Sequence, residues 1–433
     1  MTDSLKKVLL LGGGGREHAL AWKLSQSPQV SEIYAMPGND GMATLAKLKC
    51  LAGNPADVAT VMTAVKNLAI GLVVIGPEKP LEAGVADALN AAGIPVMGPT
   101  KDGAKLESSK IFAKEFMSEF GIPTASFKVC DDHGAAVAAL QEWDIEGAGI
   151  VIKADGLSAG KGVVVTHDRA EAVQTLYDFM VNPACTVKSS RILLEQKLSG
   201  KEVSAFALCD GNTFTTLGFV CDYKRVRDHD QGPNTGGMGG YAPKGWPSDA
   251  ARQFVNDGIF RRVTDGMKKR GTPFRGILFA GLMIDGEQVN VIEFNTRFGD
   301  PETQILMPLI ENDIAPLFLK AAQGMLGDDK VTLRSSSAVH VVMASEGYPE
   351  TFAGTMKLGQ KIDLPEKLLD GSNDNLLFVM GAKKKDGGWT NEGGRVLGVT
   401  ALGANIDDAR ASAYRAIDSI KFNGAHWRKD IGK

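Results

Sequence analysis

Short apolar runs alternate with amphipathic segments along the first hundred residues. Four such runs occur, at residues 8–11, 33–36, 72–75 and 94–97. Uninterrupted apolar runs of this length are typical of strands that are buried on both faces of a parallel sheet. A helical pattern over residues 81–92 separates the last two runs. This alternation predicts an open parallel α/β sheet in a first domain, residues 1–104.

The middle of the chain, residues 105–328, predicts a domain with two lobes. It begins with a helix over residues 105–120, which Gly121 and Pro123 end. A compact α/β lobe follows, about residues 126–192. Its expected elements are strands at 126–129, 149–154, 162–165 and 191–195 and a helix at 133–143. A larger lobe continues to residue 328.

The last region, residues 329–433, predicts a C-terminal α+β domain. Its apolar runs indicate strands at 338–343, 376–380 and 395–400, followed by a closing helix over 407–420. The expected fold class is therefore α/β, with an open parallel sheet first, a two-lobed domain next and a smaller mixed domain at the end.

One predicted hairpin places polar side chains together. The apolar runs 277–284 and 289–295 are joined by an Asp-Gly-Glu-Gln turn, which is typical of a β-hairpin. Alternate residues of a strand share a face, so Glu293, Asn295 and Arg297 should point the same way. Carboxylate and amide oxygens suit Mg²⁺, which is usually coordinated by substrate phosphates as well as by the protein. Alternatively, these residues only cap a strand end in water.

Composition and charge restrict the classes of partner. The net charge of -3 gives no basic footprint for nucleic acid or for an anionic membrane. The apolar runs are too short to span a bilayer, and the first run is too short for a signal peptide. Five scattered cysteines without a C-x-x-C pair suit a reducing compartment. We therefore expect a cytoplasmic protein with small-molecule or protein partners, no membrane and no nucleic acid.

A glycine turn follows the first strand, at residues 12–15. A strand, glycine turn and helix can hold an anion at the helix N-terminus. Two features argue against a dinucleotide: Glu17 stands where the third glycine is required, and the second strand ends in Pro37-Gly-Asn39 without an acidic residue. Another phosphate, or simply a tight turn, remains open. The same choice applies to Gly76-Pro-Glu78, at the end of another predicted strand.

A second glycine-rich loop follows Lys153, between two predicted strands. It is not a P-loop, because three residues separate Gly156 from Gly160 and Gly162 replaces the hydroxyl residue after Lys161. Such a loop can fold over a triphosphate as a lid, with Lys153 reaching the phosphate oxygens. Alternatively, Lys153 is a surface lysine before a flexible loop.

Two other segments carry candidate chemistry. Residues 195–202 join the two lobes, where backbone groups can bind an adenine edge and a carboxylate can bind ribose hydroxyls. An ordinary loop is the alternative. Residues 222–240 form an expected long loop that is first charged and then rich in glycine. Loops of this length are usually functional or disordered.

Eight blocks resemble those of the glycinamide ribonucleotide synthetases, or phosphoribosylamine-glycine ligases, a family of the ATP-grasp superfamily. They are Gly-Gly-Arg-Glu-His-Ala (14–19), Pro-Gly-Asn (37–39), Gly-Pro-Glu (76–78), Ser-Lys (109–110), Ile-Lys-Ala-Asp-Gly-x-x-x-Gly-Lys-Gly (152–162), Gly-Pro-Asn-Thr-Gly-Gly-Met-Gly (232–239), Glu-Phe-Asn-x-Arg-Phe-Gly-Asp-Pro-Glu (293–302) and Arg-Lys-Asp-Ile-Gly (428–432). The blocks cover the chain from end to end, in the family's single-activity form.

The resemblance implies an activity. ATP would phosphorylate the glycine carboxylate, and the amine of 5-phosphoribosylamine would attack the glycyl phosphate. The products would be glycinamide ribonucleotide, ADP and phosphate, in the second step of de novo purine synthesis. The small-molecule partners would be ATP, glycine and 5-phosphoribosylamine, with Mg²⁺ or Mn²⁺ as the cofactor. The chain would be a monomer or a small homo-oligomer.

The resemblance also implies roles for particular residues. Arg297 and Asp222 would be catalytic, and Glu293 and Asn295 would hold the metal. ATP would contact Lys110, Lys153, Gly160, Lys161, Gly162, Glu195, Gln196, Lys197, Leu198 and Glu202. The substrate-binding residues would be Gly14, Gly15, Asn39, Glu78, Gly236, Gly237 and Met238.

Two other functions remain open. One is a carboxylase or another carboxylate-amine ligase of the same superfamily, with a different acceptor. The other is a nucleotide-binding regulatory module without turnover. Lys153, Glu293, Asn295 and Arg297 together argue against the module, because a silent protein needs no complete metal and phosphoryl apparatus.

Overall fold

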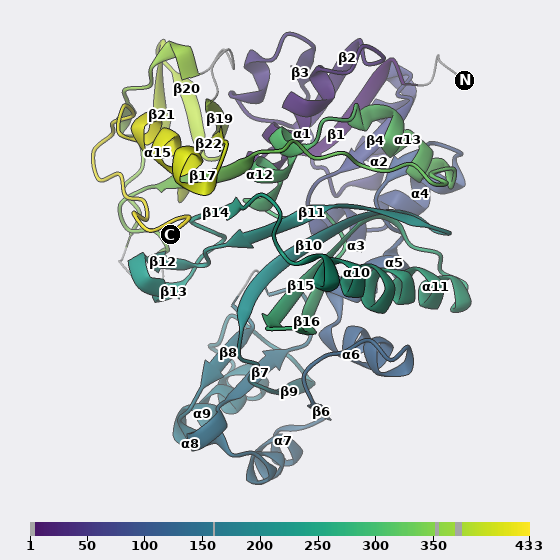
Figure 1. Ribbon diagram of the computed structural model, residues 1–433, viewed down its shortest axis with the longest axis vertical. Helices are drawn as coiled ribbons and strands as arrows, with labels where there is room; N and C mark the ends of the chain where they lie inside the picture. The colour runs from purple at the N-terminus through teal and green to yellow at the C-terminus, as the bar shows by residue number, and fades with distance from the viewer. Residues whose placement is uncertain (1–4, 159–160, 351–354, 369–374) are drawn as a thin grey trace.

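The computed structural model describes residues 5–158, 161–350, 355–368 and 375–433. Figure 1 shows an upper body, built from the beginning, the middle and the end of the chain, and a smaller lobe that projects below it. Among the described residues, no helix is both long and apolar enough to cross a membrane.

The first region is a parallel sheet, as the sequence predicted, with strands in the order β3-β2-β1-β4-β5. The short edge strand β3 was not among the four predicted runs. Val8 and Leu10 of β1 pack in one core and Leu9 and Leu11 in another, so an all-apolar run is needed to fill both faces. The elements are β1 Lys7–Gly12, α1 Gly15–Ser25, β2 Glu32–Pro37, η1 Met42–Thr44, β3 Leu48–Cys50, α2 Val58–Leu68, β4 Leu72–Ile75, α3 Glu78–Glu82, α4 Val85–Ala91 and β5 Val96–Met97.

Two helices predicted as continuous are each divided in two. The helix expected over residues 81–92 consists of α3 and α4, because Gly84 between them has a left-handed φ of 81°. The helix expected over residues 105–120 consists of α5, Lys101–Ser108, and α6, Lys110–Glu119. Ser109 is extended and its hydroxyl accepts the Phe112 N–H, so it ends one helix and caps the next.

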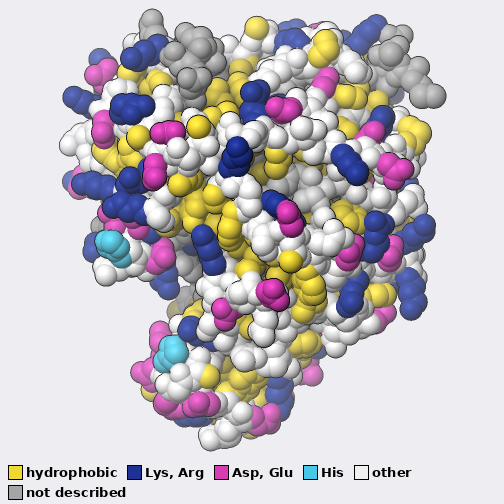
Figure 2. Space-filling view, in the orientation of Figure 1, with side chains coloured by type: hydrophobic (Ala, Val, Ile, Leu, Met, Phe, Trp, Pro, Cys, Tyr) yellow, Lys and Arg dark blue, Asp and Glu magenta, His cyan; other side chains and the backbone are white. Residues whose placement is uncertain are grey.

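The small lobe has a four-stranded antiparallel sheet in the order β6-β9-β7-β8. In Figure 2 it stands out from the body, with Lys and Arg interspersed with Asp and Glu on the visible face. Its elements are β6 Phe127–Cys130, α7 His133–Ala139, η2 Leu140–Glu142, α8 Ile145–Ala148, β7 Ile150–Ala154, β8 Val163–Thr166, α9 Arg169–Met180 and β9 Ile192–Gln196.

An eight-stranded sheet crosses the rest of the body, in the order β16-β15-β10-β11-β14-β17-β22-β19. Its first five strands precede residue 328 and its last three follow it. The sheet is therefore continuous across the expected domain boundary, through the antiparallel pair β14 and β17. Its strands are β10 Lys201–Asp210, β11 Phe214–Asp222, β14 Gly239–Ala242, β15 Arg275–Asp285, β16 Gln288–Asn295, β17 Ser337–Ala344, β19 Asn375–Val379 and β22 Arg395–Gly403.

The segment 222–240, expected as a loop, contains regular structure. It forms a small hairpin of β12, Arg225–Arg227, and β13, Gln231–Asn234, joined by η3, Asp228–Asp230, and then enters β14. His229 and Asp230 have left-handed φ values of 57° and 52°, which the tight turn requires. The hairpin was not predicted because this polar and glycine-rich sequence lacks alternating apolar residues.

Helices and a second small sheet complete the body. Helix α12, Glu302–Leu309, is buried along its whole length where it contacts α1 and the large sheet. A three-stranded sheet has the order β18-β21-β20. The remaining elements are α10 Asp249–Phe254, the π-helical η4 Val255–Phe260, α11 Arg261–Lys269, α13 Ile314–Gln323, β18 Lys361–Ile362, η5 Glu366–Leu368, β20 Ala382–Lys385, β21 Gly388–Asn391 and α15 Ile406–Ile417.

Aromatic side chains from four parts of the sequence form the centre of the core. The Phe206 ring lies 4.5 Å from that of Phe279 and 6.4 Å from that of Phe298, between ring centroids. Phe298 in turn lies 6.1 Å from Phe318 on α13. These contacts connect β10, β15, the segment after β16 and α13, so the cluster fixes the strand ends that precede the functional residues.

Replacement of Phe206 by alanine should lower the free energy of unfolding by about 3–5 kcal/mol, because the side chain is fully buried and leaves a cavity. Urea denaturation followed by circular dichroism measures the change. Phe254→Ala is the matched control, since Phe254 is 42% exposed, and should change stability by about 0.5 kcal/mol or less. Equal losses in the two variants would contradict the assigned core.

Candidate functional site

A cavity of about 240 Å³ lies where the small lobe, helices α5 and α6, and strand β16 meet. We call it the central cavity. Eight residues singled out from the sequence line it: Glu78, Lys110, Lys153, Gly162, Glu195, Glu293, Asn295 and Arg297. Residues that are more than 200 positions apart in the chain are thus brought to one site.

The end of β16 presents its polar side chains together, as strand alternation predicts. Arg297 donates from Nη2 to Asn295 Oδ1 over 3.2 Å, and the same nitrogen lies 2.7 Å from Glu107 Oε1. Arg297 Nε lies 3.8 Å from Glu78 Oε2, so this guanidinium joins β16 to the first sheet. Glu293 faces the same cavity. The side chains on this face are therefore held in fixed directions.

Two buried lysines share the carboxylate of Glu195 in the cavity wall. Lys153 lies 2.8 Å from Glu195 Oε1, and Lys114 lies 2.7 Å from Glu195 Oε2. Lys153 also donates to the Ile292 carbonyl over 3.2 Å, and Lys114 to the Thr124 hydroxyl over 2.6 Å. All three charged side chains are less than 5% exposed. Burial lowers the pKa of Lys114 to about 8, against the attraction of Glu195.

Basic and acidic side chains are mixed in the lining of the cavity. Burial also lowers the pKa of Lys110, whose ammonium donates to the Gly156 carbonyl over 2.8 Å. Burial alone would raise the pKa of Glu293, but Lys224, Lys153, Lys110 and Arg297 together lower it below its ordinary value. Glu293 is therefore ionised. Four lysine or arginine side chains and four glutamate side chains line the cavity, so the lining as a whole has no cationic excess. Lys110 and Lys153 are ammonium donors in this lining, and phosphate oxygens accept hydrogen bonds from such groups.

The oxygen atoms of Glu293 and Asn295 fit a shared divalent cation. The described residues contain no group of three or more His, Cys, Asp or Glu side chains that could hold a metal by themselves. A Mg²⁺ ion does not need one, because it keeps several waters and takes oxygens from a bound phosphate. One carboxylate and one amide at the cavity wall are the protein ligands that such an arrangement requires.

The other predicted nucleotide contacts lie around the cavity and not all within it. Gly162 lines the cavity, whereas Lys161 is exposed and Gly160 lies outside the described residues. Of the segment between the lobes, only Glu195 reaches the cavity wall. Glu202 on β10 forms an ion pair with Lys224. Gln196 ends β9, and Lys197 and Leu198 follow it. None of these three residues lines the cavity.

Asp222 lies at the end of β11 in an acidic environment. Its Oδ1 atom is buried and has no hydrogen-bond partner among the described residues. Burial raises the pKa of Asp222 to about 7, against the attraction of Lys224 and with the repulsion of Glu302. An oxygen in this state can accept a hydrogen bond from a ligand or carry a proton itself.

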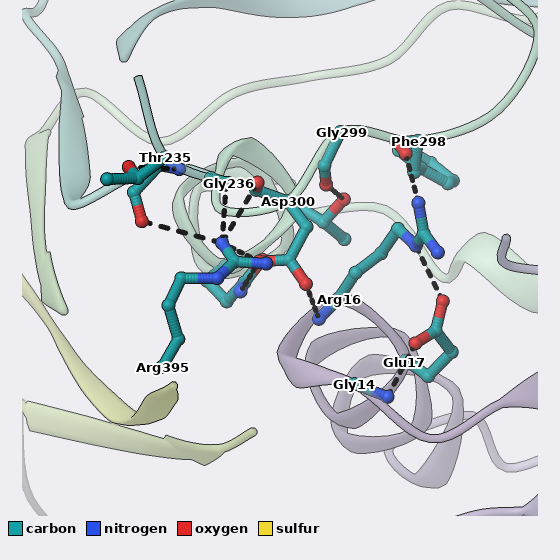
Figure 3. Close-up of polar contacts among 12 residues, drawn as sticks. Gly14, Arg16, Glu17, Thr235, Gly236, Phe298, Gly299, Asp300 and Arg395 are labelled. Atoms are coloured by element: carbon teal, nitrogen blue, oxygen red, sulfur yellow. Dashed lines mark hydrogen bonds and ion pairs between the residues drawn. The ribbon is translucent and has the colours of Figure 1, made fainter. Parts of the chain in front are cut away.

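Two arginines hold Asp300 where three regions of the chain meet (Figure 3). Asp300 Oδ1 lies 3.0 Å from Arg395 Nη1, and Asp300 Oδ2 accepts the Arg16 backbone N–H over 3.3 Å. Arg395 also donates to the Gly236 carbonyl over 2.7 Å, which ties the glycine loop to β22. Arg16 donates to the Phe298 carbonyl and pairs with Glu17.

The structure places the predicted acceptor residues in three surroundings. Gly236 and Gly237 lie beside Arg395, while the Met238 side chain is fully buried against Val226 and Ala344. Met238 therefore presents only backbone to this region. Gly14 and Gly15, at the start of α1, lie close to this region, because a Cβ atom on Gly14 would be 3.4 Å from Asp300 Oδ2. Asn39 follows β2.

Glu17 decides the geometry around the first glycine turn. Its Oε2 accepts the Gly14 N–H over 2.7 Å, and a Cβ atom on Gly76 would lie only 2.1 Å from its Oε1. Gly76 is therefore required for packing, which settles part of the choice between turn and ligand site. Asn39 donates to the carbonyls of Gly13 and Val379 and lines a second cavity of about 270 Å³.

Several residues at these sites were not identified from the sequence. Glu107 and Lys114 flank Lys110 at helical spacing, on the faces of α5 and α6 that meet the cavity, so the 3.6-residue period could have indicated them. Asp300 and Arg16 lie inside recognised blocks. Lys224 has no such signal, because only the folded chain brings it to Glu202 and Glu293.

Three family models match the chain. They are described as phosphoribosylglycinamide synthetase, N domain, over residues 6–107; the ATP-grasp (A) domain of the same enzyme over residues 108–303; and its C domain over residues 338–433. Together they cover most of the chain.

Whole-chain comparisons agree with the family models. The phosphoribosylamine–glycine ligase of Phenylobacterium zucineum is 43% identical over 427 residues, which is 98% of each chain. The trifunctional purine biosynthetic protein adenosine-3 of Homo sapiens is 40% identical over 98% of this chain and 42% of its own length. A solved phosphoribosylamine–glycine ligase of Thermotoga maritima has a TM-score of 0.84 and 32% identity, covering 98% of this chain and all of that one. A biotin carboxylase of Campylobacter jejuni shares the fold, with a TM-score of 0.74, 14% identity and coverage of 99% and 94%.

Replacement of the buried Lys114 by methionine should change how stability depends on pH. The folded protein releases the Lys114 proton near pH 8, whereas an unfolded lysine holds it to about 10.4. The unfolded state thus binds more protons in this window, and this residue's contribution to wild-type stability rises with pH. From pH 8 to 10 the wild type should gain on the order of 2 kcal/mol relative to Lys114→Met.

Urea denaturation at a series of pH values measures this difference in unfolding free energy. The exposed Lys66→Met on α2 is the matched control for the loss of a lysine. A difference between Lys114→Met and the wild type that stays constant across the window would contradict the lowered pKa of Lys114.

Proposed function

The chain belongs to the phosphoribosylglycinamide synthetase family, and on this basis we propose that the central cavity is its site of phosphoryl transfer. The chain is a phosphoribosylamine–glycine ligase. It uses ATP to join glycine to 5-phosphoribosylamine and releases glycinamide ribonucleotide, ADP and phosphate, a step of purine biosynthesis. The observation that carries the proposal is the convergence of Lys110, Lys153, Glu293, Asn295 and Arg297 in one cavity.

The nucleotide phosphates are assigned to the lysines that line the central cavity. Lys110 and Lys153 supply fixed charges close to the glycine-rich loop, with Gly160, Lys161 and Gly162 as proposed backbone and side-chain contacts. The adenine is assigned to the segment between the lobes, Glu195 to Leu198, and the ribose to Glu202. Support comes from Glu195, which lies near the end of β9, where the two lobes join. It forms an ion pair with Lys153 of β7.

Glu293 and Asn295 are the proposed metal ligands. A bound divalent cation would neutralise charge on the phosphates and withdraw electrons from the transferred group. Mg²⁺ or Mn²⁺ both suit oxygen ligands of this kind. The surrounding lysines and Arg297 hold the Glu293 carboxylate in its charged form, which a cation ligand requires.

Arg297 is proposed to face the glycine carboxylate and the phosphoryl group that moves to it. Negative charge spreads over the phosphoryl oxygens as the bond to ADP breaks, and a fixed guanidinium stabilises that charge without having to reorganise. Glu78 and Glu107 hold Arg297 in place through ion pairs. The glycyl phosphate then accepts the sugar amine at its carbonyl carbon and releases phosphate.

Asp222 and the Gly236, Gly237 and Met238 backbone are assigned to the acceptor side of the site. The unpartnered Oδ1 of Asp222 could accept a hydrogen bond from an amine. Gly14, Gly15, Asn39 and Glu78 are the proposed contacts of phosphoribosylamine on the first sheet. Glu78 is the strongest of them, because it lines the central cavity and its pKa is lowered by Arg297 against the effect of burial.

We assign these roles to three proposed domains, residues 1–104, 105–328 and 329–433, with residues 126–192 as the lid. A cytoplasmic location and a monomer or small homo-oligomer also remain proposals. The five cysteines are free thiols, which suits a reducing compartment.

The direct test of the reaction is ADP release by the purified protein. ADP should form rapidly with ATP, glycine and freshly made phosphoribosylamine, and far more slowly without either acceptor substrate. Turnover with bicarbonate or with another amino acid in place of glycine would favour a different ligase or carboxylase and would contradict the proposal.

Glu293→Gln should reduce turnover by about a hundredfold or more, because the amide keeps the shape but loses the charge that attracts the cation. The measurement is kcat at increasing Mg²⁺ concentration, and the variant should need a higher concentration for half-maximal rate. Glu287→Gln, in the exposed turn of the same hairpin, is the matched control. Wild-type turnover and Mg²⁺ dependence in Glu293→Gln would remove the metal assignment.

Arg297→Lys should lower kcat by about 10²–10³-fold, because a lysine keeps the charge but not the planar fork that contacts several oxygens at once. Its circular dichroism spectrum should match that of the wild type. Arg252→Lys, a surface pair with Asp249, controls for the same substitution. A kcat close to that of the wild type in Arg297→Lys would exclude Arg297 from the reacting centre.

A further inference from the structure

The block Arg428–Gly432 lies at the end of the chain, and none of its residues lines the central cavity. Arg428 is nevertheless one of the largest fully buried side chains among the described residues, with 1% of its side chain exposed. A buried arginine is expensive unless its donors are all used. Its contacts therefore indicate what the position requires.

Those contacts are directed to the β12–β13 hairpin and to Asp430. Arg428 Nη1 lies 2.7 Å from Asp230 Oδ1 and donates to the Arg225 carbonyl over 3.1 Å. Nε and Nη2 bind the two oxygens of Asp430 over 2.8 and 2.6 Å. Asp430 Oδ2 also accepts the His229 N–H over 2.9 Å. The tail thus holds both ends of the hairpin turn.

The Arg428 guanidinium also lies over Tyr223, the residue that follows Asp222 in the chain. It lies 4.4 Å from the centre of the Tyr223 ring, and the Gly432 N–H donates to the Tyr223 hydroxyl over 3.3 Å. A stacked guanidinium fixes a ring in plane and in position. Tyr223 stands directly between Asp222 and Lys224 in the chain, so its placement determines theirs.

Lys224 connects this region to the proposed nucleotide contacts. Its carbonyl accepts both the N–H and the hydroxyl of Thr235, over 2.7 and 2.8 Å, so the hairpin also fixes its backbone. Its ammonium forms an ion pair with Glu202, the proposed ribose contact. A small displacement of Tyr223 would therefore move the cation that holds Glu202.

We propose that Arg428 is a positioning residue for the ligase reaction: it clamps the β12–β13 hairpin and Tyr223 so that Asp222 keeps its place at the site and the Lys224 ammonium stays beside Glu202. The inference rests on the proposed site in the central cavity. It assigns a role in turnover to the C-terminal block, through a chain of contacts that begins more than 200 residues away in the sequence. A hydrophobic side chain would fill the same space, but it could not hold Asp230 and the Arg225 carbonyl.

Two variants test the clamp with different risks to folding. Arg428→Met removes every contact of the guanidinium, whereas Asp230→Gly removes one exposed partner only. The Asp230 side chain is 69% exposed and its φ is 52°, so glycine neither empties the core nor strains the backbone. His229→Gly is the matched control, because it introduces glycine at the adjacent left-handed position, φ 57°, and keeps the ion pair.

The readouts separate positioning from stability. The kcat of Arg428→Met should fall about ten- to a hundredfold and that of Asp230→Gly about threefold. The KM for ATP should rise as well, because the displaced Lys224 pairs with Glu202, the proposed ribose contact. Trypsin should cleave after the exposed Arg225 and Arg227 faster in both variants than in the wild type. His229→Gly should match the wild type in kcat and in cleavage.

A second control addresses general destabilisation. Lys23→Met removes another buried cation, which bonds the Ile310 carbonyl far from the hairpin, and should lower stability without lowering kcat at a temperature where the protein is folded. Equal losses of kcat in Lys23→Met and Arg428→Met would show that Arg428 acts through stability alone, and would overturn the inference.

Lys224→Met distinguishes this inference from the proposed function. If it lowers kcat while Asp230→Gly and Arg428→Met leave kcat intact, the clamp is wrong and the site stands. If Lys224→Met itself leaves both kcat and the KM for ATP intact, the clamp fails, whereas the proposed site is tested separately by Glu293→Gln. If Arg428→Met does not fold, the kcat and cleavage rate of Asp230→Gly against His229→Gly decide the inference.

Discussion

The site depends on holding several cations together in a place that is largely closed to water. Lys114 and Lys153 repel each other, and Glu195 between them makes their burial possible. Arg297 is held in the same way by Glu78 and Glu107. Ionic groups out of water are stable only when they are paired and hydrogen-bonded. Each lysine or arginine of the wall can therefore be buried only because a neighbouring carboxylate pairs with it. The resulting array of paired charges is in place before a nucleotide arrives, and this preorganisation is what phosphoryl transfer needs.

The fold supplies this wall from separate regions. Glu78 comes from α3 of the first region, Lys153 from the small lobe and Arg297 from the segment after β16, and the buried α12 packs between α1 and the large sheet. Asp300 performs a similar task at the meeting point of α1 and β22, through Arg16 and Arg395. Charged side chains thus determine how the regions dock, while the phenylalanine cluster supplies most of the apolar burial beneath them.

Local patterns were sufficient for the elements and for part of the site. The parallel sheet, the hairpin that carries Glu293 and Asn295, and their shared face follow from apolar runs and strand alternation. The divided helices could not be predicted, because the φ of Gly84 and the cap at Ser109 depend on the surrounding packing. The β12–β13 hairpin was missed because its strands carry charged and glycine residues that bind the tail instead of a core. Lys224 and Arg428 act through contacts distant in sequence, which no local period reveals.

The continuity of the large sheet has an evolutionary consequence. A chain cut near residue 328 would expose the edges of β14 and β17, and bare strand edges invite aggregation. The shared sheet therefore favours keeping the middle and last regions together when the chain is joined to other domains. The alignment with the human trifunctional protein agrees with this constraint, since it includes 98% of this chain within a much longer polypeptide.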